Sequence, residues 1–453
     1  MTPDELAHWA SEFEDFHARF AYLFARSEPR EEARQYLRGL LAPVGRKNCW
    51  QMAEVVGEPG PQPMQRLLYS ARWDADAARD ELQRFAIERV GAADGIGILD
   101  ETGFLKKGTQ SVGVKRQYTG TAGKVENCQV GVFLTYFSRR GYTFLDRRLY
   151  LPREWCTDWE RRRAAKVPDE VTFQTKPELA VAMLQHAWAQ GVPMAWVTGD
   201  EVYGNAPAVR DTVARAGKKY VLAVSAHTPV WRERVLRAAP TGEIPPWETV
   251  AAVVAGWSPR RWRRITVDEG EKGPRTYAWA RERVRERRDG QPGPAGWLLA
   301  RRSLAAPPDL AYYLSNASQH TSLLLLAKVA STRWSIETTI EEGKGEAGLD
   351  EYEVRYWHSW HRHITLSMMA HAWLAAIRQT ASEDPPDPAL AEVSVAEVRR
   401  LLEVALPLPP RSPELRLAWS QWRRARRQQA RRSHYRRRGA IWPETGLHRN
   451  RPP

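Results

Sequence analysis

Three carboxylates in this chain have the surroundings that metal-dependent chemistry requires. Asp100 ends the run GIGILD and Asp200 ends PMAWVTGD. Both runs are short, apolar and β-prone, so we expect each carboxylate at the exposed end of a buried strand. Glu337 lies in the helix-like stretch RWSIETTIEEGK. Mg²⁺ prefers a few carboxylate oxygens, and two such ions can clamp the attacking and leaving oxygens of a phosphate. The three residues therefore predict a metal-dependent site that cuts phosphodiesters.

A mixed sheet with helices packed on it must position these residues. Residues 93–225 alternate strand and helix patterns: GIGILDE, a hairpin of CQVGVFLTYF and YTFLDRRLYL, the helix KPELAVAMLQHAWAQG, the strand MAWVTGD, and one more helix and strand. This alternation predicts an α/β fold with Asp100 and Asp200 on neighbouring strands. Residues 226–325 contain short β-like runs between Gly/Pro turns and predict an inserted β domain. Helix patterns return over 326–381.

The two ends of the chain differ in composition from the middle. Residues 1–92 read as helices, and no strand pattern interrupts them. Their segment KNCWQMAEVVGEPGPQPMQRLLYSARW has two short helix patterns around a Gly/Pro turn, so it is either a helix-turn-helix or part of a helical packing domain. Residues 382–453 comprise the linker SEDPPDP and a basic region with the arginine-rich stretch WRRARRQQARRSHYRRR.

A cationic, glycine-rich segment directly follows Asp100. It carries Lys106, Lys107, Lys115 and Arg116, which suit contacts to phosphates beside a cut bond. The alternative is an ordinary solvated loop, because charged runs usually face water.

Several other residues have two interpretations. Trp334 could stack on an unpaired base, although a helical tryptophan is more often in a core. Glu101 and Glu201 follow the two aspartates, and strand alternation predicts that their side chains point away from the site. For the histidines of WHSWHRH, packing of a helix face is favoured over a metal site: His358, His361 and His363.

Composition agrees with a nucleic-acid enzyme without identifying one. The formal net charge of +14 points to a polyanionic partner, and 453 residues correspond to about three domains. The three cysteines are far apart and form no CxxC pair, which argues against zinc fingers and disulfides and favours the cytoplasm. Neither a long apolar span nor a signal-peptide pattern is present in the sequence, so we expect no membrane association.

Five segments, in this order, resemble DDE transposases of bacterial insertion sequences: DETGFLKKG, VGVKRQYTGTAGKVENCQVGVFL, TKPEL, WVTGDEVYG and EEGKGEAGLDEYEVRYW. The similarity is to the family named after insertion sequence seven hundred and one, in the clan named after insertion sequence four. It extends over roughly residues 30 to 435, and such long blocks are more specific than a short motif. The resemblance implies an RNase H-like catalytic core, interrupted by the β insertion.

The clan also has a helix signature, Y-x2-R-x3-E-x6-K. Arg333, Glu337 and Lys344 match it, whereas Ala330 takes the Tyr position. The resemblance implies that Glu337 is the third catalytic and metal-binding carboxylate, rather than either glutamate of the EEG that follows. Arg333 and Lys344 would then neutralise phosphate charge beside the scissile bond.

The resemblance implies two successive phosphoryl transfers on double-stranded DNA. Two Mg²⁺ ions, or Mn²⁺ in their place, would first serve hydrolysis that exposes the 3′-hydroxyls of the transposon ends. The same site would then join those hydroxyls to target DNA in the bacterial nucleoid. By analogy with the family, a homodimer is expected in the DNA complex, because two ends are joined at one locus. The resemblance also implies that the helices of residues 1–92 bind the DNA ends or dimerise. The alternatives are an RNase H-fold nuclease without strand transfer and a non-catalytic DNA-binding regulator.

Overall fold

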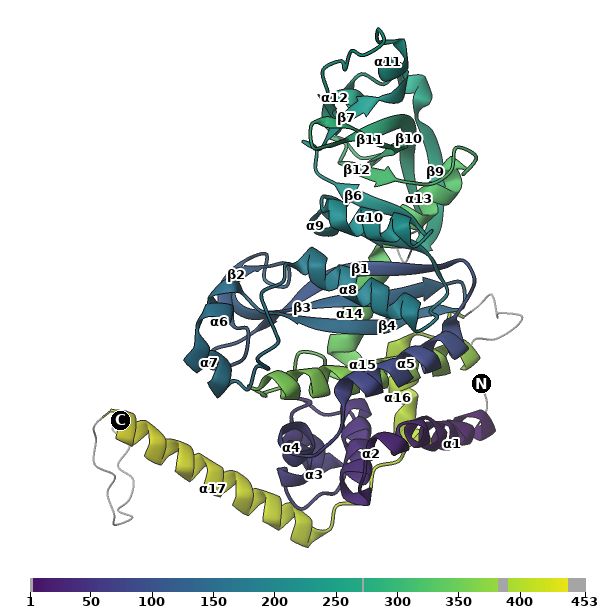
Figure 1. Ribbon diagram of the computed structural model, residues 1–453. Coiled ribbons are helices and arrows are strands. Elements are labelled where there is room, and N and C mark those ends of the chain that lie inside the picture. The colour runs from purple at the N-terminus through teal and green to yellow at the C-terminus, as the bar shows by residue number, and fades with distance from the viewer. Residues whose placement is uncertain (1–2, 271–272, 382–389, 439–453) are drawn as a thin grey trace, which may run out of the picture.

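A twelve-stranded mixed sheet runs through the described part of the chain, and helices pack on both of its faces (Figure 1). This computed structural model describes residues 3–270, 273–381 and 390–438, so the linker SEDPPDP lies outside the described residues. The strand order is β2-β3-β1-β5-β6-β12-β11-β10-β7-β8, with β4 paired to β3 and β9 paired to β10. The fold class is therefore α/β, as the alternation of strand and helix patterns predicts.

The strands have the following bounds: β1 (Gly95–Leu105), β2 (Lys115–Thr119), β3 (Lys124–Ser138), β4 (Gly141–Tyr150), β5 (Met194–Gly199), β6 (Lys219–Val224), β7 (Pro229–Arg232), β8 (Glu248–Thr249), β9 (Arg263–Gly270), β10 (Gly273–Arg288), β11 (Gln291–Arg302) and β12 (Leu310–Ser315). The helices are α1 (Pro3–Arg19), α2 (Ser27–Leu41), α3 (Cys49–Val55), α4 (Gln62–Tyr69), α5 (Ala75–Val90), α6 (Arg153–Thr157), α7 (Trp159–Ala164), α8 (Lys176–Ala189), α9 (Glu201–Gly204), α10 (Pro207–Arg215), α11 (Glu233–Ala238), α12 (Val250–Ala255), α13 (Leu323–Ser331), α14 (Trp334–Ala347), α15 (Trp357–Ala381), α16 (Val395–Ala405) and α17 (Pro413–Arg437).

The first half of the sheet has a buried core on each side. β1 pairs antiparallel with β3 and parallel with β5, and β3 and β4 form the expected hairpin. Side chains alternate between the faces, so that Ile98 belongs to the core under α14 and α15, and Leu99 to the core under α8. Helix α8 begins with a reciprocal cap between Thr175 and Glu178, in the segment TKPEL. Helices on both faces hold β1 and β5 in fixed register.

The strands of the segment between β6 and α13 are hydrogen-bonded into the same sheet as β6. β12 pairs antiparallel with β6, and β11, β10, β7 and β8 extend the sheet outward (Figure 1). The segment contains the strands β7 to β12 together with the short helices α11 and α12. The pairing satisfies the backbone edge of β6, which would otherwise be exposed along Val221–Val224.

Helices α1–α5 form the N-terminal part of the fold and pack around α15. The buried face of α15 contacts α2, α4 and α5, and its Trp373 ring lies 5.4 Å from the ring of Phe13. Helices α3 and α4 are the two helices expected around the Gly/Pro turn. No helix among the described residues combines the length and the apolar character needed to cross a bilayer.

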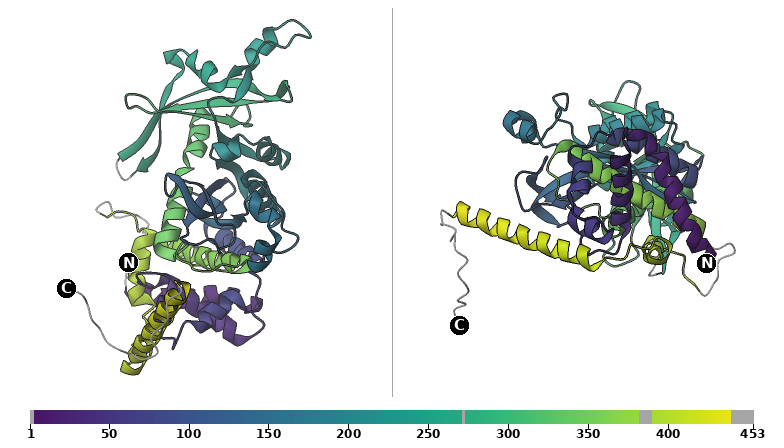
Figure 2. Two further views of the ribbon diagram at one scale, coloured as in Figure 1. Left: turned by 90° about the vertical axis from the view of Figure 1, so that its left-hand side faces the viewer. Right: turned by 90° about the horizontal axis from the view of Figure 1, so that it is seen from below.

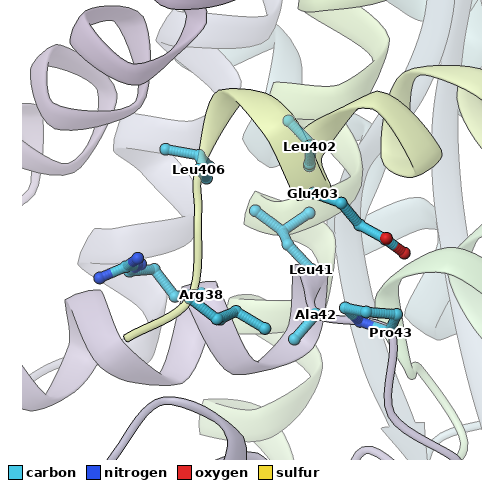
Figure 3. A pocket seen from close by; sticks show the side chains of 8 residues that line it. Arg38, Leu41, Ala42, Pro43, Leu402, Glu403 and Leu406 are labelled. Carbon is cyan, nitrogen blue, oxygen red and sulfur yellow. The ribbon is translucent and has the colours of Figure 1, made fainter. Parts of the chain in front are cut away.

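A small hollow separates α2 from α16, and it is a packing seam (Figure 3). It is lined by Leu41, Leu402 and Leu406, and the Arg38 guanidinium closes one side by donating to the Pro407 carbonyl at 2.7 Å. Its volume of about 20 Å³ holds little more than one water molecule, so the hollow is too small for a substrate.

Helix α17 is anchored at its N-terminal half and projects from the body at its C-terminal half (Figure 1, Figure 2). Trp419 is buried and donates its indole N–H to the Glu58 carbonyl at 2.9 Å. The Trp422 ring lies 5.1 Å from that of Trp50, on α3. The first residues of the arginine-rich stretch therefore contact α3, and the rest of it lies on the projecting half of α17.

Candidate active site

Asp100 and Asp200 lie next to each other on parallel strands. The register pairs Leu99 of β1 with Gly199 of β5, so each aspartate comes directly after a paired residue. β5 ends at that point, and Asp200 caps α9 by accepting a hydrogen bond from the Val202 N–H at 2.9 Å. β1 continues to Leu105, so Asp100 lies within its strand and not at the end, where the sequence placed it.

Burial and mutual repulsion destabilise the charges of this pair. Burial raises the pKa of Asp100 to about 7, and the Asp200 charge adds to this effect. The pKa of Asp200 is raised by burial and by the nearby Glu101. A divalent cation would relieve the repulsion, and carboxylate oxygens are the ligands that a hard cation prefers. The pair therefore fits a metal ion of the Mg²⁺ class.

Glu337 lies near the pair but is bound to an arginine. It occupies the first turn of α14, and its side chain is 53% exposed. The Arg333 guanidinium lies 2.7 Å from Glu337 Oε1 and 3.5 Å from Asp100 Oδ2, so it bridges the two carboxylates. Within the described residues, no three His, Cys, Asp or Glu side chains are arranged to hold one ion. The three carboxylates thus approach one another with a guanidinium between them.

A cleft of about 650 Å³ opens beside the carboxylates. The core contributes Asp200, Glu201, Arg333, Trp334 and Glu337 to its wall. The opposite wall comes from the strands after β6 and carries Arg275, Tyr277, Arg301 and Tyr313. The sequence did not identify this second wall. The sequence pattern that could have indicated this wall is the spacing of Arg275 and Tyr277. They are two residues apart, so both side chains lie on the same face of β10.

Lys344 and Trp334 extend the site along α14. Lys344 donates to the Thr102 hydroxyl at 2.8 Å, on the strand that carries Asp100, and burial lowers its pKa. Trp334 is half-buried at the cleft, and the Arg275 guanidinium lies 4.2 Å from the centre of its ring. Trp334 therefore lies at the cleft, whereas Lys344 contacts the strand that carries Asp100.

The cationic segment after Asp100 divides into an exposed part and a buried part. Lys115 and Arg116 lie on β2, a strand where the sequence indicated only a loop, and both are exposed, as is Lys107. Lys106 turns inward, and its ammonium group donates to the Tyr352 carbonyl at 3.1 Å. The same group lies 3.5 Å from the centre of the Tyr352 ring. Burial lowers its pKa to about 8. Lys106 therefore supports the fold and is not part of the exposed cationic surface.

The two glutamates that follow the aspartates behave differently. Glu101 is held by the Lys176 ammonium at 2.5 Å and the Tyr203 hydroxyl at 2.6 Å, and it does not line the cleft. Glu201 does line the cleft, contrary to the expectation from strand alternation. The reason is that β5 ends at Gly199, so position 201 belongs to a helix and alternation no longer applies.

The histidines of α15 make packing contacts, as expected. His363 is fully buried between the Tyr36 hydroxyl and the Gly348 carbonyl, at 2.8 and 3.1 Å. His358 and His361 bond to backbone carbonyls. Each of the three rings therefore has at least one nitrogen bonded within the fold.

The Asp100→Asn variant should be more stable than the wild type when no divalent metal is present. The pKa of Asp100 is raised above its ordinary value of 3.8, so the folded state takes up protons that the unfolded state has lost. Wild-type stability should therefore fall as pH rises from about 4 to about 7. Melting in EDTA across this range should show a gap between the two proteins that widens with pH. A constant gap would contradict the raised pKa of Asp100.

Comparisons with known proteins give one family and two individual similarities. A family model described as DDE superfamily endonuclease matches residues 19–289, a range that includes Asp100 and Asp200 and ends before Glu337. A probable transposase for insertion sequence element IS701 from Microchaete diplosiphon is 31% identical over 175 residues. That match covers 38% of this chain and 43% of the relative, so it spans less than half of the relative's length. The solved structure of a piggyBac transposase synaptic complex with hairpin DNA aligns over 92% of this chain and 82% of that chain, with 11% identity and a TM-score of 0.43.

Proposed function

The chain belongs to the DDE superfamily of endonucleases, and from this premise we propose that it is a transposase of an insertion sequence. It would bind the ends of the element, cut DNA by metal-dependent hydrolysis, and join the 3′-hydroxyl ends to target DNA. The observation that carries the proposal is the pairing of Asp100 and Asp200 on adjacent parallel strands, beside a cleft lined by arginines.

In the proposed site, Asp100, Asp200 and Glu337 hold two divalent ions, Mg²⁺ or Mn²⁺. Bound ions of this class lower the pKa of water and stabilise charge on the attacking and leaving oxygens. No side-chain base is then required. The cleft beside the carboxylates is lined by Arg275, Arg301 and Arg333, so the DNA strand would lie in it with its phosphates near these guanidinium groups.

The remaining site residues would position DNA. Arg333 and Lys344 neutralise phosphate charge near the scissile bond, since both lie beside β1 or its carboxylate. Trp334 offers a half-buried ring in the cleft for stacking on a base, which would displace the Arg275 guanidinium or pack beside it. The exposed cations Lys107, Lys115 and Arg116 would contact the flanking backbone.

Two DNA ends must be brought to one target, so we propose that the working assembly is a homodimer on double-stranded DNA in the bacterial nucleoid. The projecting half of α17 would add phosphate contacts that do not depend on the DNA sequence. Sequencing the DNA that flanks the gene should reveal inverted repeats. The purified protein should cut a fragment carrying those repeats when Mg²⁺ is present and leave it intact in EDTA. Intact DNA under both conditions would contradict the proposal.

Truncation after Arg423 should weaken DNA binding for all sequences and flatten its salt dependence. Each lost phosphate contact removes nearly one unit of the log–log slope of affinity against salt. The truncation follows Arg423 because the preceding residues anchor α17. Trp419 is buried and Arg423 pairs with Glu54 at 2.6 Å, so removing all of α17 would also remove part of the fold. Binding titrations of unrelated duplexes at several salt concentrations measure the effect. An unchanged salt slope would show that α17 serves assembly instead.

A further inference from the structure

Three polar side chains meet behind the two aspartates, on the face of the sheet that α8 covers. Glu101 follows Asp100 on β1, so its side chain points to the opposite face of the strand. One Glu101 carboxylate oxygen accepts from the Lys176 ammonium at 2.5 Å, and the other accepts from the Tyr203 hydroxyl at 2.6 Å. The three residues belong to β1, α8 and α9. Their contacts therefore join three separate parts of the chain.

The proposed chemistry makes no direct use of this cluster. Tyr203 is fully buried, and the side chains of Lys176 and Glu101 are 25% and 18% exposed. Both oxygens of Glu101 already accept a hydrogen bond, and the group does not line the cleft, so it is not a candidate metal ligand. Withdrawing a carboxylate and an ammonium from water costs free energy. A role in the site would explain why the chain places them there.

The backbone beside these side chains holds both aspartates. The Glu101 N–H donates to Asp100 Oδ1 at 2.8 Å. The Val202 N–H donates to Asp200 Oδ1 at 2.9 Å, and Val202 lies in the same short helix as Tyr203. Because the Tyr203 hydroxyl is bonded to Glu101, the two backbone donors are linked through side chains. The direction of each aspartate carboxylate therefore depends on this link.

Lys176 connects the link to α8. It is the first residue of that helix, within the segment TKPEL, and the reciprocal cap between Thr175 and Glu178 fixes the start of the helix. Helix α8 packs on β3, β4 and α9, so the Lys176 ammonium approaches Glu101 from a fixed support. Its charge also offsets that of Glu101, which lies close to the two aspartates.

We propose that Glu101, Lys176 and Tyr203 form a brace that sets the direction of the Asp100 and Asp200 carboxylates for a divalent ion. They are positioning residues, because none of them lines the cleft. The inference rests on the proposed function in taking the two aspartates as metal ligands. Partners that orient metal ligands in this way typically account for roughly 10- to 100-fold in metal affinity.

Titration of the full-length protein with Mn²⁺ in the absence of DNA, followed by electron paramagnetic resonance, tests the brace. Tyr203→Phe removes one hydroxyl and no charge, because burial holds the pKa of Tyr203 well above its ordinary value. Its Mn²⁺ affinity should fall about tenfold. Tyr136→Phe is the matched control, since the Tyr136 ring is also fully buried and its hydroxyl donates to the Ala92 carbonyl at 2.8 Å. This control should melt at a lower temperature and bind Mn²⁺ like the wild type.

Substitution of Lys176 separates positioning from simple charge. Lys176→Met removes a positive charge, which by Coulomb attraction alone would strengthen the binding of a cation. The brace predicts weaker Mn²⁺ binding instead, with recovery in Lys176→Arg, which keeps a cationic donor. Lys176 is partly exposed, so this pair of variants decides the matter if Tyr203→Phe does not fold.

Three results would overturn the brace: unchanged Mn²⁺ affinity in Tyr203→Phe, unchanged or stronger binding in Lys176→Met, and an equal loss of affinity in Tyr136→Phe. Magnesium-dependent cleavage of end-bearing DNA is measured in parallel. A wild type that binds Mn²⁺ and cuts DNA, with brace variants that match it, overturns the brace alone. A wild type that binds no more Mn²⁺ than Asp100→Asn and leaves DNA intact overturns the proposed function as well.

Discussion

The Asp100→Asn variant is expected to lose DNA cleavage by several orders of magnitude while it still binds DNA. Asparagine keeps the size of the side chain but removes the charge that balances a divalent cation. DNA binding should persist because phosphate contacts come from other residues. Asp200→Asn should behave in the same way, since Asp200 is its neighbour on the parallel strand. Cleavage rates on labelled end-bearing DNA, with gel-shift binding in parallel, measure the effect.

Asp94→Asn is the matched control for this substitution. Asp94 is exposed immediately before β1, so the same chemical change there should leave cleavage close to the wild-type rate. Near-normal cleavage by Asp100→Asn would remove the basis of the site assignment. Equal losses in Asp94→Asn would instead point to a general effect of charge on DNA binding.

Glu337→Gln should abolish cleavage, whereas Glu341→Gln and Glu342→Gln should retain most of it. Glu337 lines the cleft, and Glu341 is exposed one turn further along α14. Glu342 faces away from the cleft, where it accepts from the Tyr142 hydroxyl at 2.9 Å and lies 3.0 Å from His371 Nε2. Its amide variant should therefore melt at a lower temperature, because it weakens contacts with buried groups.

Initial cleavage rates and melting temperatures of the three variants separate the two effects. Rates that fall in Glu341→Gln or Glu342→Gln but not in Glu337→Gln would show that the helix signature is aligned in the wrong register. Ala330 stands at the tyrosine position of that signature, so the signature matches at three of its four positions. The comparison of the three variants therefore tests the alignment.

The strand pattern around each aspartate was sufficient to predict their proximity. Both follow short apolar runs that can be buried on a sheet, and the register of Leu99 with Gly199 confirms that the strands are neighbours. The joining of β6 to β12 was not predictable in the same way. Val221 and Ser315 pair across a long stretch of chain, and local residue patterns contain no information about such distant partners.

Side-chain direction limited the prediction of the site. Lys106 and Lys107 are adjacent in a basic loop, yet Lys106 is half-buried against Tyr352 and Lys107 is exposed. Charge alone does not distinguish them, because the aliphatic stem of a lysine can pack on an aromatic ring. The second wall of the cleft, which carries Arg275, was not predicted for a related reason. Arginine is abundant in this chain, and only the sheet topology brings that one opposite Trp334.

Covalent joining of a labelled DNA end to an unlabelled target plasmid tests the proposed transposase function most directly. The reaction contains the purified full-length protein, a duplex with the terminal repeat and a free 3′-hydroxyl, the plasmid and Mg²⁺. We predict that the label appears in the plasmid with the wild type and does not appear with Asp100→Asn or in EDTA. Cleaved ends that are never joined would indicate a nuclease without strand transfer. DNA that is bound but neither cut nor joined would indicate a regulator, and either result would contradict the account.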